Sequence, residues 1–251
     1  MQAPDGHRAG LDALLLAACA RSEASRVADF GSGSGAVGLA VASRLPSASV
    51  TLIEREAGAL ADARATLAHP LNAGLAARLS LLEADLTARG AAREAAGLAD
   101  GMFDHVLANP PYNDAAHRVS PNPRRAAAHV ADDDTFEVWA RTAAATLRPG
   151  GRLTVIARPS NLPAILAAWS GRFSGPFLLP IHTRPGAASR LLAHGRLGAR
   201  DPLALLPALR LGSTGEAAST TDALTSGDAW IDLEGGGAVL KSHADNETDE
   251  D

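Results

Sequence analysis

The sequence predicts an α/β fold in which a mainly parallel, seven-stranded sheet ends in an antiparallel hairpin. Three observations lead to this prediction. Short apolar runs alternate with longer stretches rich in alanine and leucine, which is the order of strands and helices in βαβ units. The stretches between the runs are long enough for the crossovers that parallel strands need. The last two extended runs are separated instead by Arg184-Pro185-Gly186, a turn sequence that favours antiparallel pairing.

The individual elements follow in order along the chain. Apolar runs predict five parallel strands, at residues 27–30, 49–53, 79–82, 103–107 and 153–157. Four stretches of helical character accompany them, at residues 36–44, 57–68, 135–146 and 160–169. Residues 177–182 and 190–196 form the predicted hairpin, and residues 203–211 are a candidate for a further edge element.

We expect the chain to divide into one folded domain and two simpler segments. Residues 1–212 form the predicted domain, because 46% of the 251 residues are hydrophobic and can supply a sizeable core. Residues 213–241 are expected to be a loosely ordered extension, since their first half is rich in Gly, Ser, Thr and Ala. Residues 242–251 hold five acids and neither Lys nor Arg, which predicts an acidic, disordered tail.

Composition excludes several classes of function. A single lysine, Lys241, speaks against P-loop and Schiff-base enzymes, and a single cysteine, Cys19, excludes an internal disulfide. The eight histidines lack the spacing of metal ligands, so we expect no metal. No apolar run is long enough to span a membrane, and the first residues lack the order of a secretion signal. We therefore expect no membrane association and a cytoplasmic location; the oligomeric state stays open.

A glycine-rich turn follows the first predicted strand. The sequence ADFGSGSG at residues 28–35 contains Gly31, Gly33 and Gly35, which let the backbone turn tightly and approach a ligand. Glu54, at the end of the second strand, can accept hydrogen bonds from ribose hydroxyls. The spacing differs from the dinucleotide fingerprint G-x-G-x-x-G. With Asp29 it resembles the S-adenosylmethionine site of the Rossmann-like (class I) methyltransferases. A Gly-Ser surface loop is the alternative.

Asp85 lies where the third predicted strand ends. In class I methyltransferases an acid at this place receives the adenine amino group of the cofactor, so the resemblance implies the same contact for Asp85. An aspartate at a strand-to-helix junction also commonly caps the helix. The two roles are compatible.

The fourth predicted strand is followed by Asn109-Pro110-Pro111-Tyr112. Two prolines stop strand pairing and stiffen the exit, at the edge of the sheet where open α/β folds bind ligands. The Asn109 side-chain oxygen and the Pro110 carbonyl can each accept one N–H of a planar amino group, which turns the nitrogen lone pair toward a methyl donor. Tyr112 can stack on the flat substrate, worth about 1–3 kcal/mol for a base. Alignment of the amino group with the methyl donor can lower the activation barrier by roughly 7–11 kcal/mol, so the reaction needs no metal and no strong base. A proline-rich loop that merely ends the strand is the alternative.

This motif resembles that of amino-methyltransferases that act on adenine N6 or glutamine N5. The segments GHRAGLDALLL (residues 6–16) and SPNPRRAAAH (residues 120–129), and also residues 180–196, resemble the bacterial family that methylates N6 of adenine 37 in a valine tRNA. The resemblance covers roughly residues 2–212. It implies S-adenosylmethionine as cofactor, S-adenosylhomocysteine as product and tRNA as partner. It also implies that Asp12 folds over the cofactor and that Asn109 contributes to the cofactor site.

Two segments near the predicted site are basic. Residues 172–200 hold five arginines and residues 115–130 hold three, with no acid in either segment. Because the acidic tail accounts for the whole net charge of −5, the body of the chain is neutral, and RNA would have to meet such local patches. A solvated basic face is the alternative. We expect substrate contacts from Pro111, Arg124, Arg125, Arg184 and Arg190.

Two further functions stay open. One is methylation of glutamine N5 in release factors, whose enzymes usually carry a helical domain before the glycine-rich turn. The other is a non-catalytic RNA-binding module with a vestigial pocket. The sequence favours methylation of adenine N6 in tRNA over both.

Overall fold

The computed structural model describes residues 10–21, 23–111, 133–174, 176–234 and 240–242. The predictions for Tyr112, Arg124 and Arg125 lie outside these residues, as do residues 1–9 and the acidic tail from residue 243 on. The rest of the predicted site lies within them.

A nine-stranded sheet organises the chain, in the order β3-β2-β1-β4-β5-β7-β6-β8 with β9 paired to β6. Its parallel part consists of β1 (Arg26–Phe30), β2 (Ser49–Glu54), β3 (Leu79–Glu83), β4 (Phe103–Ala108) and β5 (Leu147–Ala157). β7 (Arg190–Arg196) is antiparallel to β5 and to β6 (Phe177–His182), so the predicted fold class is confirmed. Two short strands in the candidate edge segment extend the sheet beyond the predicted seven strands: β8 (Ala204–Leu205) and β9 (Leu209–Arg210).

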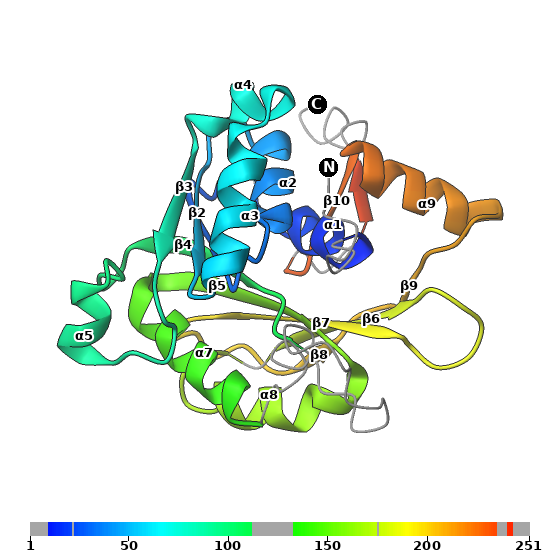
Figure 1. Cartoon of the computed structure of the whole chain (residues 1–251). Helices are drawn as coiled ribbons and strands as arrows, with labels where there is room; N and C mark the ends of the chain where they lie inside the picture. Colours follow the sequence, from blue (N-terminus) through cyan, green and yellow to red (C-terminus); the bar gives the residue numbers. More distant parts are fainter. Residues whose placement is uncertain (1–9, 22, 112–132, 175, 235–239, 243–251) are drawn as a thin grey trace, which may run out of the picture.

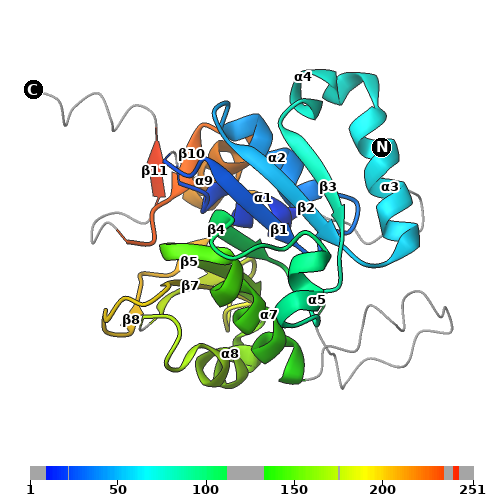
Figure 2. The ribbon, with the colours of Figure 1, turned by 90° about the vertical axis from the view of Figure 1, so that its left-hand side faces the viewer.

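Helices cover both faces of this sheet (Figures 1 and 2). One face carries α1 (Leu11–Ala18), α2 (Ala36–Arg44), α3 (Ala57–Ala68), the 3-10 turn η1 (Pro70–Asn72) and α4 (Ala73–Ala76). The other face carries α5 (Gly90–Ala95), α7 (Asp133–Thr146), the 3-10 turn η2 (Pro159–Asn161) and α8 (Leu162–Trp169). Two separate apolar clusters fill the two interfaces, which explains why the central strands are apolar on both sides.

Strand β4 lies at the centre of the sheet, between β1 and β5, and all of its residues are buried. The register pairs Ala108 with Phe30 on β1 and with Val155 on β5. The carboxyl ends of these three parallel strands therefore meet at one edge of the sheet. The turns that follow them lie side by side there, which is where open α/β sheets bind their ligands.

Asp104 fastens the opposite edge of the sheet. Its carboxylate accepts hydrogen bonds from the Ser25 hydroxyl at 2.7 Å and from the Arg26 N–H at 2.9 Å, and it pairs with Arg148 at 2.8 Å. Burial alone would raise the pKa of Asp104, but the hydrogen bonds from Ser25 and Arg26 outweigh burial and lower it to about 2. The acid therefore stays ionised and ties the starts of β1, β4 and β5 together.

The segment 213–241, for which the sequence predicts loose order, contains regular structure. Helix α9 (Gly215–Ser226) is followed by β10 (Ala229–Ile231), which pairs antiparallel with β11 (Leu240–Ser242). α9 and β10 contact α1, and four side chains of the segment are buried in the cluster beneath that helix: Leu224, Ala229, Ile231 and Leu233. Local composition misses this order because its source is burial against a distant helix. The division of the chain into a domain and two segments stays a prediction.

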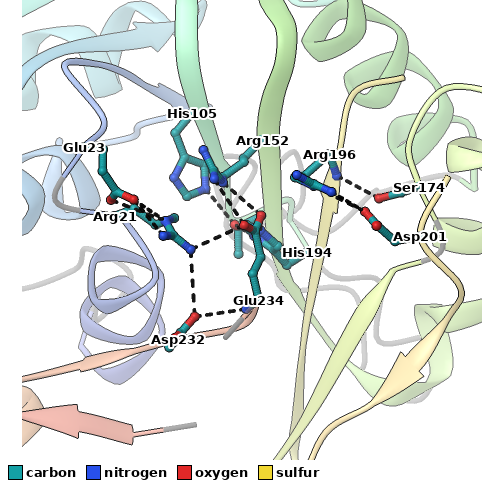
Figure 3. Close-up of polar contacts among 11 residues, drawn as sticks. Arg21, Glu23, His105, Arg152, Ser174, His194, Arg196, Asp201, Asp232 and Glu234 are labelled. Carbon is teal, nitrogen blue, oxygen red and sulfur yellow. Dashed lines mark hydrogen bonds and ion pairs between the residues drawn. The ribbon is translucent and has the colours of Figure 1, made fainter. Parts of the chain in front are cut away.

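Glu234 fastens this C-terminal segment to the sheet (Figure 3). Its carboxylate accepts two hydrogen bonds from Arg152 on β5, at 2.9 and 3.1 Å, and one from Arg21 at 3.3 Å. A third donor group is Nε2 of His194 on β7, at 2.9 Å. Burial alone would raise the pKa of Glu234, but the bonds from His194 and Arg152 lower it well below its ordinary value. The segment is therefore held by a buried, ionised carboxylate.

Candidate functional site

The glycine-rich turn connects β1 to α2 at the carboxyl edge of the sheet. Its three glycines have φ angles of 64°, 54° and 86° at Gly31, Gly33 and Gly35, a region that L side chains rarely adopt. A Cβ on Gly31 would come within 2.5 Å of the Trp139 ring, so that ring lies directly against the turn. Backbone conformation and close approach together explain why glycine stands at residue 31.

Asp29 supports the turn from within the sheet. Its side chain is 2% exposed, and its Oδ2 accepts the Gly38 N–H of α2 at 3.0 Å. Burial raises the pKa of Asp29 to about 7; the Gly38 hydrogen bond opposes this rise, and the neighbouring Glu54 carboxylate adds to it. Asp29 therefore links β1 to α2 across the glycines and sets the geometry of the turn.

Glu54 ends β2 beside the same turn. Its Oε2 accepts the Gly33 N–H at 3.0 Å, and its Oε1 accepts the N–H groups of Arg55 and Glu56 at 2.7 and 2.9 Å. A carboxylate has about four lone-pair positions. Three are used by these backbone bonds, so one position on Oε2 remains for a ligand hydroxyl. Binding both ribose hydroxyls, as the sequence predicts, would require Glu54 to release Gly33.

The turn and its surroundings fit S-adenosylmethionine. A Cβ on Gly33 would meet no heavy atom of the described chain within 4 Å, so this side of the turn is open to a ligand. The Ser32 hydroxyl is buried and has no hydrogen-bond partner among the described residues. An open glycine, an unused hydroxyl and the remaining position on Glu54 offer contacts to a ribose-bearing cofactor.

Asp85 lies two residues beyond β3. Its Oδ1 accepts the Thr87 N–H at 2.8 Å, and its Oδ2 lies 3.5 Å from the Arg55 guanidinium. Burial alone would raise the pKa of Asp85, but the hydrogen bonds from Thr87 and the charge of Arg55 lower it below its ordinary value. The bond to Thr87 closes a turn, and helix α5 begins only at Gly90 with Arg89 as its N-cap residue, so the predicted helix-capping role of Asp85 is wrong. Contact with the adenine of the cofactor stays a prediction.

Asn109 and Pro110 leave the sheet next to the glycine-rich turn. Because Ala108 pairs with Phe30, Asn109 and Gly31 are the first residues beyond two adjacent parallel strands. Pro110 is buried and Asn109 is partly exposed. The structure thus brings together the two motifs that the sequence singles out, although they are far apart along the chain.

Asp12 and Arg190 contact each other. The sequence assigns Asp12 to the cofactor and Arg190 to the RNA, but both carboxylate oxygens of Asp12 accept hydrogen bonds from the Arg190 Nε, at 3.0 and 2.9 Å. Both side chains are mostly buried, with 19% and 31% exposed. The pair ties the start of α1 to the start of β7 at the edge of the sheet that carries Asn109.

The arginines around β6 and β7 are largely paired with acids from elsewhere in the chain. Arg172 pairs with Glu137 on α7 at 2.6 Å, and Arg196 pairs with Asp201 at 2.9 Å. The sequence does not reveal this, because neither acid lies within the basic segment. Arg184, in the turn between β6 and β7, is exposed. The positive charge available to RNA is therefore smaller than the number of arginines indicates.

Two residues at this edge were not singled out from the sequence. Trp139 packs edge-on against Phe30, with ring centroids 6.5 Å apart, and is only partly buried. Its helical spacing indicates a core residue, and no local signal reveals the turn that it meets. Arg158 directly follows β5, at the same edge as Asn109. Its place after a buried strand is a signal that the sequence does carry.

The described ranges show no candidate metal site, no membrane-spanning helix and no reactive cysteine. No three His, Cys, Asp or Glu side chains are grouped there so as to hold a metal ion. None of the helices there is long and apolar enough to cross a bilayer. Cys19 is buried and donates to the Leu15 carbonyl, and burial raises the pKa of its thiol to about 12, so it is an unsuitable nucleophile.

Comparison with known proteins yields one family and relatives that methylate protein or RNA, according to their names. The family model described as the methyltransferase small domain matches residues 9–170. A release factor glutamine methyltransferase of Deinococcus radiodurans is 32% identical over 162 residues, covering 61% of this chain and 53% of that protein. A tRNA1(Val) (adenine(37)-N6)-methyltransferase of Pedobacter heparinus is 31% identical over 152 residues, covering 59% of both. The chain thus spans little more than half the length of these curated relatives.

One solved structure is similar over almost its whole length. It is a predicted O-methyltransferase, protein Atu636 of Agrobacterium tumefaciens, with 40% sequence identity and a TM-score of 0.74. The similarity covers 86% of this chain and 96% of that one. The fold described above is therefore shared with that protein far beyond the glycine-rich turn.

Proposed function

Because the chain belongs to the methyltransferase small domain family, we propose that it transfers a methyl group from S-adenosylmethionine to the exocyclic N6 of an adenine in tRNA. The family is dependent on S-adenosylmethionine, and the residues around the glycine-rich turn fit that cofactor. The proposed target is adenine 37 of a valine tRNA, the activity in the name of the Pedobacter relative. A cytoplasmic location, where tRNA would be met, is part of the same proposal.

The observation that carries the proposal is the position of Asn109 and Pro110 beside Gly31. Asn109 directly follows Ala108, which is paired with the last residue of β1, so its amide stands next to the turn that approaches the cofactor. An exocyclic amino group has two N–H donors, and the Asn109 side chain and the Pro110 carbonyl offer two acceptors. A buried proline fixes one of them, so the amino group would be oriented by a rigid pair.

The chemistry then divides between cofactor and protein. S-adenosylmethionine, when bound, supplies an electrophilic methyl group. Asn109 and Pro110 would hold the amino nitrogen with its lone pair toward that group. Glu54 and the glycine-rich turn would hold the ribose of the cofactor. Transfer to the amino nitrogen would leave S-adenosylhomocysteine, and the methylated amino group would release one proton to solvent. Orientation of the amino group is thus the main contribution of these residues.

We predict that Asn109→Ala lowers kcat on tRNA by about a hundredfold, the cost of losing one well-placed polar contact in a transition state. Cofactor affinity, measured by calorimetry, should stay within about twofold of the unmodified protein, because the turn is unchanged. Asn72→Ala, which alters an asparagine in η1, is the matched control and should keep full activity. Full activity of Asn109→Ala would contradict the acceptor role.

The proposed substrate is tested by offering purified protein total tRNA or a release factor, with labelled cofactor, followed by mass analysis of the nucleosides. The proposal expects label in N6-methyladenosine. Label in the release factor and none in tRNA would favour the alternative, glutamine N5-methylation, which the Deinococcus relative supports. A side-chain amide is also a planar amino group, so the same two acceptors would serve it. Absence of saturable cofactor binding would favour a non-catalytic RNA-binding module.

Transfer to a hydroxyl, the activity for which the Agrobacterium protein is named, suits these residues less well. A hydroxyl has one donor hydrogen, so one of the two acceptors would be left without a partner. A neutral hydroxyl would also need a general base. Among the described residues, His105 and His194 are buried inside the sheet, away from this edge. Each ring is hydrogen-bonded to the Thr154 hydroxyl group.

A further inference from the structure

Arg158 lies beside the Asn-Pro-Pro turn. It is the first residue after β5, and its backbone is still extended, with φ −81° and ψ 149°. The register of β4 and β5 pairs Ala108 with Val155. Asn109 is the first residue beyond β4 and Arg158 the first beyond β5, so the two residues leave adjacent parallel strands at the same edge of the sheet.

Arg190 lies level with Arg158 on the other side. The antiparallel register of β5 and β7 pairs Ala157 with Leu191, so the next pair is Arg158 with Arg190. Arg190 is bonded to Asp12 at the start of α1. These three residues contain two guanidinium groups and one carboxylate, and so carry one net positive charge.

Alternation along the strands puts this group on one face of the sheet. Two positions further into the sheet on each strand, the side chains on that face belong to the apolar cluster beneath α1: Leu107, Ile156 and Leu192. At the edge above this cluster, the same face carries the side chains of Asn109, Arg158 and Arg190. The amide acceptor and the two arginines therefore face the same space in front of α1.

The position of Arg158 is fixed by its neighbours. Its backbone N–H donates to the Asn161 side chain at 3.2 Å, and its carbonyl accepts the Asn161 N–H at 2.9 Å. Pro159 follows and restricts the chain as it enters η2. The Nε of Arg158 is buried, and the residue as a whole is partly buried. A rigid arginine loses little entropy when it binds an anion.

We propose that Arg158 is a substrate-positioning residue that binds a backbone phosphate of the RNA next to the target adenine, with Arg190 completing the anion site. The inference rests on the proposed tRNA substrate. A nucleotide whose base reaches Asn109 carries a phosphate on each side, and a guanidinium fork is the side chain best suited to a phosphate. A phosphate and the Asp12 carboxylate would share Arg190.

The test measures methylation of total tRNA by Arg158→Ala, by Arg158→Lys and by the control Arg148→Ala, which removes an arginine from the opposite end of the same strand. For Arg158→Ala we expect KM for tRNA to rise about tenfold, with kcat and the cofactor Kd little changed. The slope of log KM against log salt should fall by about 0.7–0.9, the value for one lost phosphate contact. Arg158→Lys should restore the slope and only part of the KM. Thermal unfolding establishes that each variant is folded.

Each other outcome overturns the proposal in a recognisable way. A rise in the cofactor Kd without a rise in the KM for tRNA would assign Arg158 to the carboxylate of the cofactor. Equal changes of the KM for tRNA in Arg148→Ala and Arg158→Ala would show that the change reflects the net charge of the protein and not a contact of Arg158. If the unmodified protein methylates tRNA and Arg158→Ala does so with unchanged KM and salt slope, the phosphate contact is wrong and the proposed function stands. If the unmodified protein methylates no tRNA, both fail.

Discussion

His105, Thr154 and His194 form a chain of hydrogen bonds across β4, β5 and β7. His105 Nε2 lies 2.7 Å from the Thr154 hydroxyl oxygen, which lies 2.7 Å from His194 Nδ1. Because ionised Glu234 only accepts, His194 Nε2 must carry a hydrogen and its Nδ1 must accept one from Thr154. The threonine oxygen then accepts from His105 Nε2. Burial lowers the pKa of both imidazoles, which agrees with two neutral rings.

The Asp29 carboxyl makes stability depend on pH in an unusual direction. Its pKa in the folded protein is raised to about 7 from an ordinary value of 3.8. The protonated side chain is thus favoured by folding, so its contribution is fully present below pH 3.8 and is lost as the pH rises toward 7. We predict that Asp29→Asn removes this contribution, so that the unfolding free energy of the variant increases relative to that of the unmodified protein as the pH rises from 4 to 7, as measured by urea titration.

Asp62→Asn, which alters an exposed aspartate on α3, is the matched control for this prediction. It should keep the pH dependence of the unmodified protein. If the unfolding free energies of Asp29→Asn and the unmodified protein change in parallel between pH 4 and pH 7, the Asp29 carboxyl is ionised throughout and the proposed cause is wrong.

At the scale of elements, Glu234 is the carboxylate that joins the C-terminal segment to β5 and β7. Glu234 is the only described residue of that segment that pairs with Arg152, and it also binds Arg21 and His194. We predict that Glu234→Ala lowers the unfolding free energy by about 3–5 kcal/mol, because it leaves buried donors without their acceptor. Urea unfolding measures the loss. Glu216→Ala, at an exposed position of α9, should cost less than about 1 kcal/mol. Equal, small losses in both variants would show that the segment is held by apolar contacts alone.

The same reasoning explains why this segment is ordered although its composition is not that of a strong helix or strand. Helix α9 buries Leu224 against α1, and β10 buries Ala229 and Ile231 in the same cluster. Glu234 then joins the segment to two strands of the sheet. Each contact is with a residue far away in sequence, so the order of the element depends on the rest of the fold being present.

At the scale of the whole molecule, ionisable groups with opposing effects on stability determine where stability is greatest. Asp104 and Glu234 have lowered pKa values, so their contribution is present above their ordinary pKa and is lost as the pH falls. Asp29 acts in the opposite direction, since its contribution is lost as the pH rises. His105 and His194 are buried with lowered pKa values, so their contribution is also lost as the pH falls below 6.5, and two imidazoles outweigh the single Asp29 there. We therefore predict a maximum of the unfolding free energy near neutral pH, at about pH 6–7.

Urea unfolding across the acidic and neutral range measures this maximum. Asp29→Asn should make the rise in stability from acid to neutral pH steeper, and Asp104→Asn should reduce the loss on the acidic side. A stability that rises steadily from acid to pH 8 in the unmodified protein would contradict this balance between the ionisable groups.

The sequence by itself determined the fold class, the places of the main strands and the two central motifs. These follow from local patterns: apolar runs of strand length, helical stretches between them, and glycine or proline where a strand ends. In a parallel sheet the carboxyl ends of strands share one edge, so the strand pattern alone predicts that Gly31 and Asn109 meet. The structure confirms the fold and places these residues beyond a pair of adjacent strands.

Only the tertiary structure decided which distant side chains pair. Asp12 is joined to Arg190, and Trp139 lies against Gly31, although neither contact has a local signal. Glu234 likewise meets Arg152, which lies 82 residues earlier in the chain. Ion pairs and ring contacts depend on how helices and strands pack, and packing is fixed by the combined burial of residues that the sequence keeps far apart. The motifs are therefore local, whereas the charge and shape of the surface around them are properties of the folded chain.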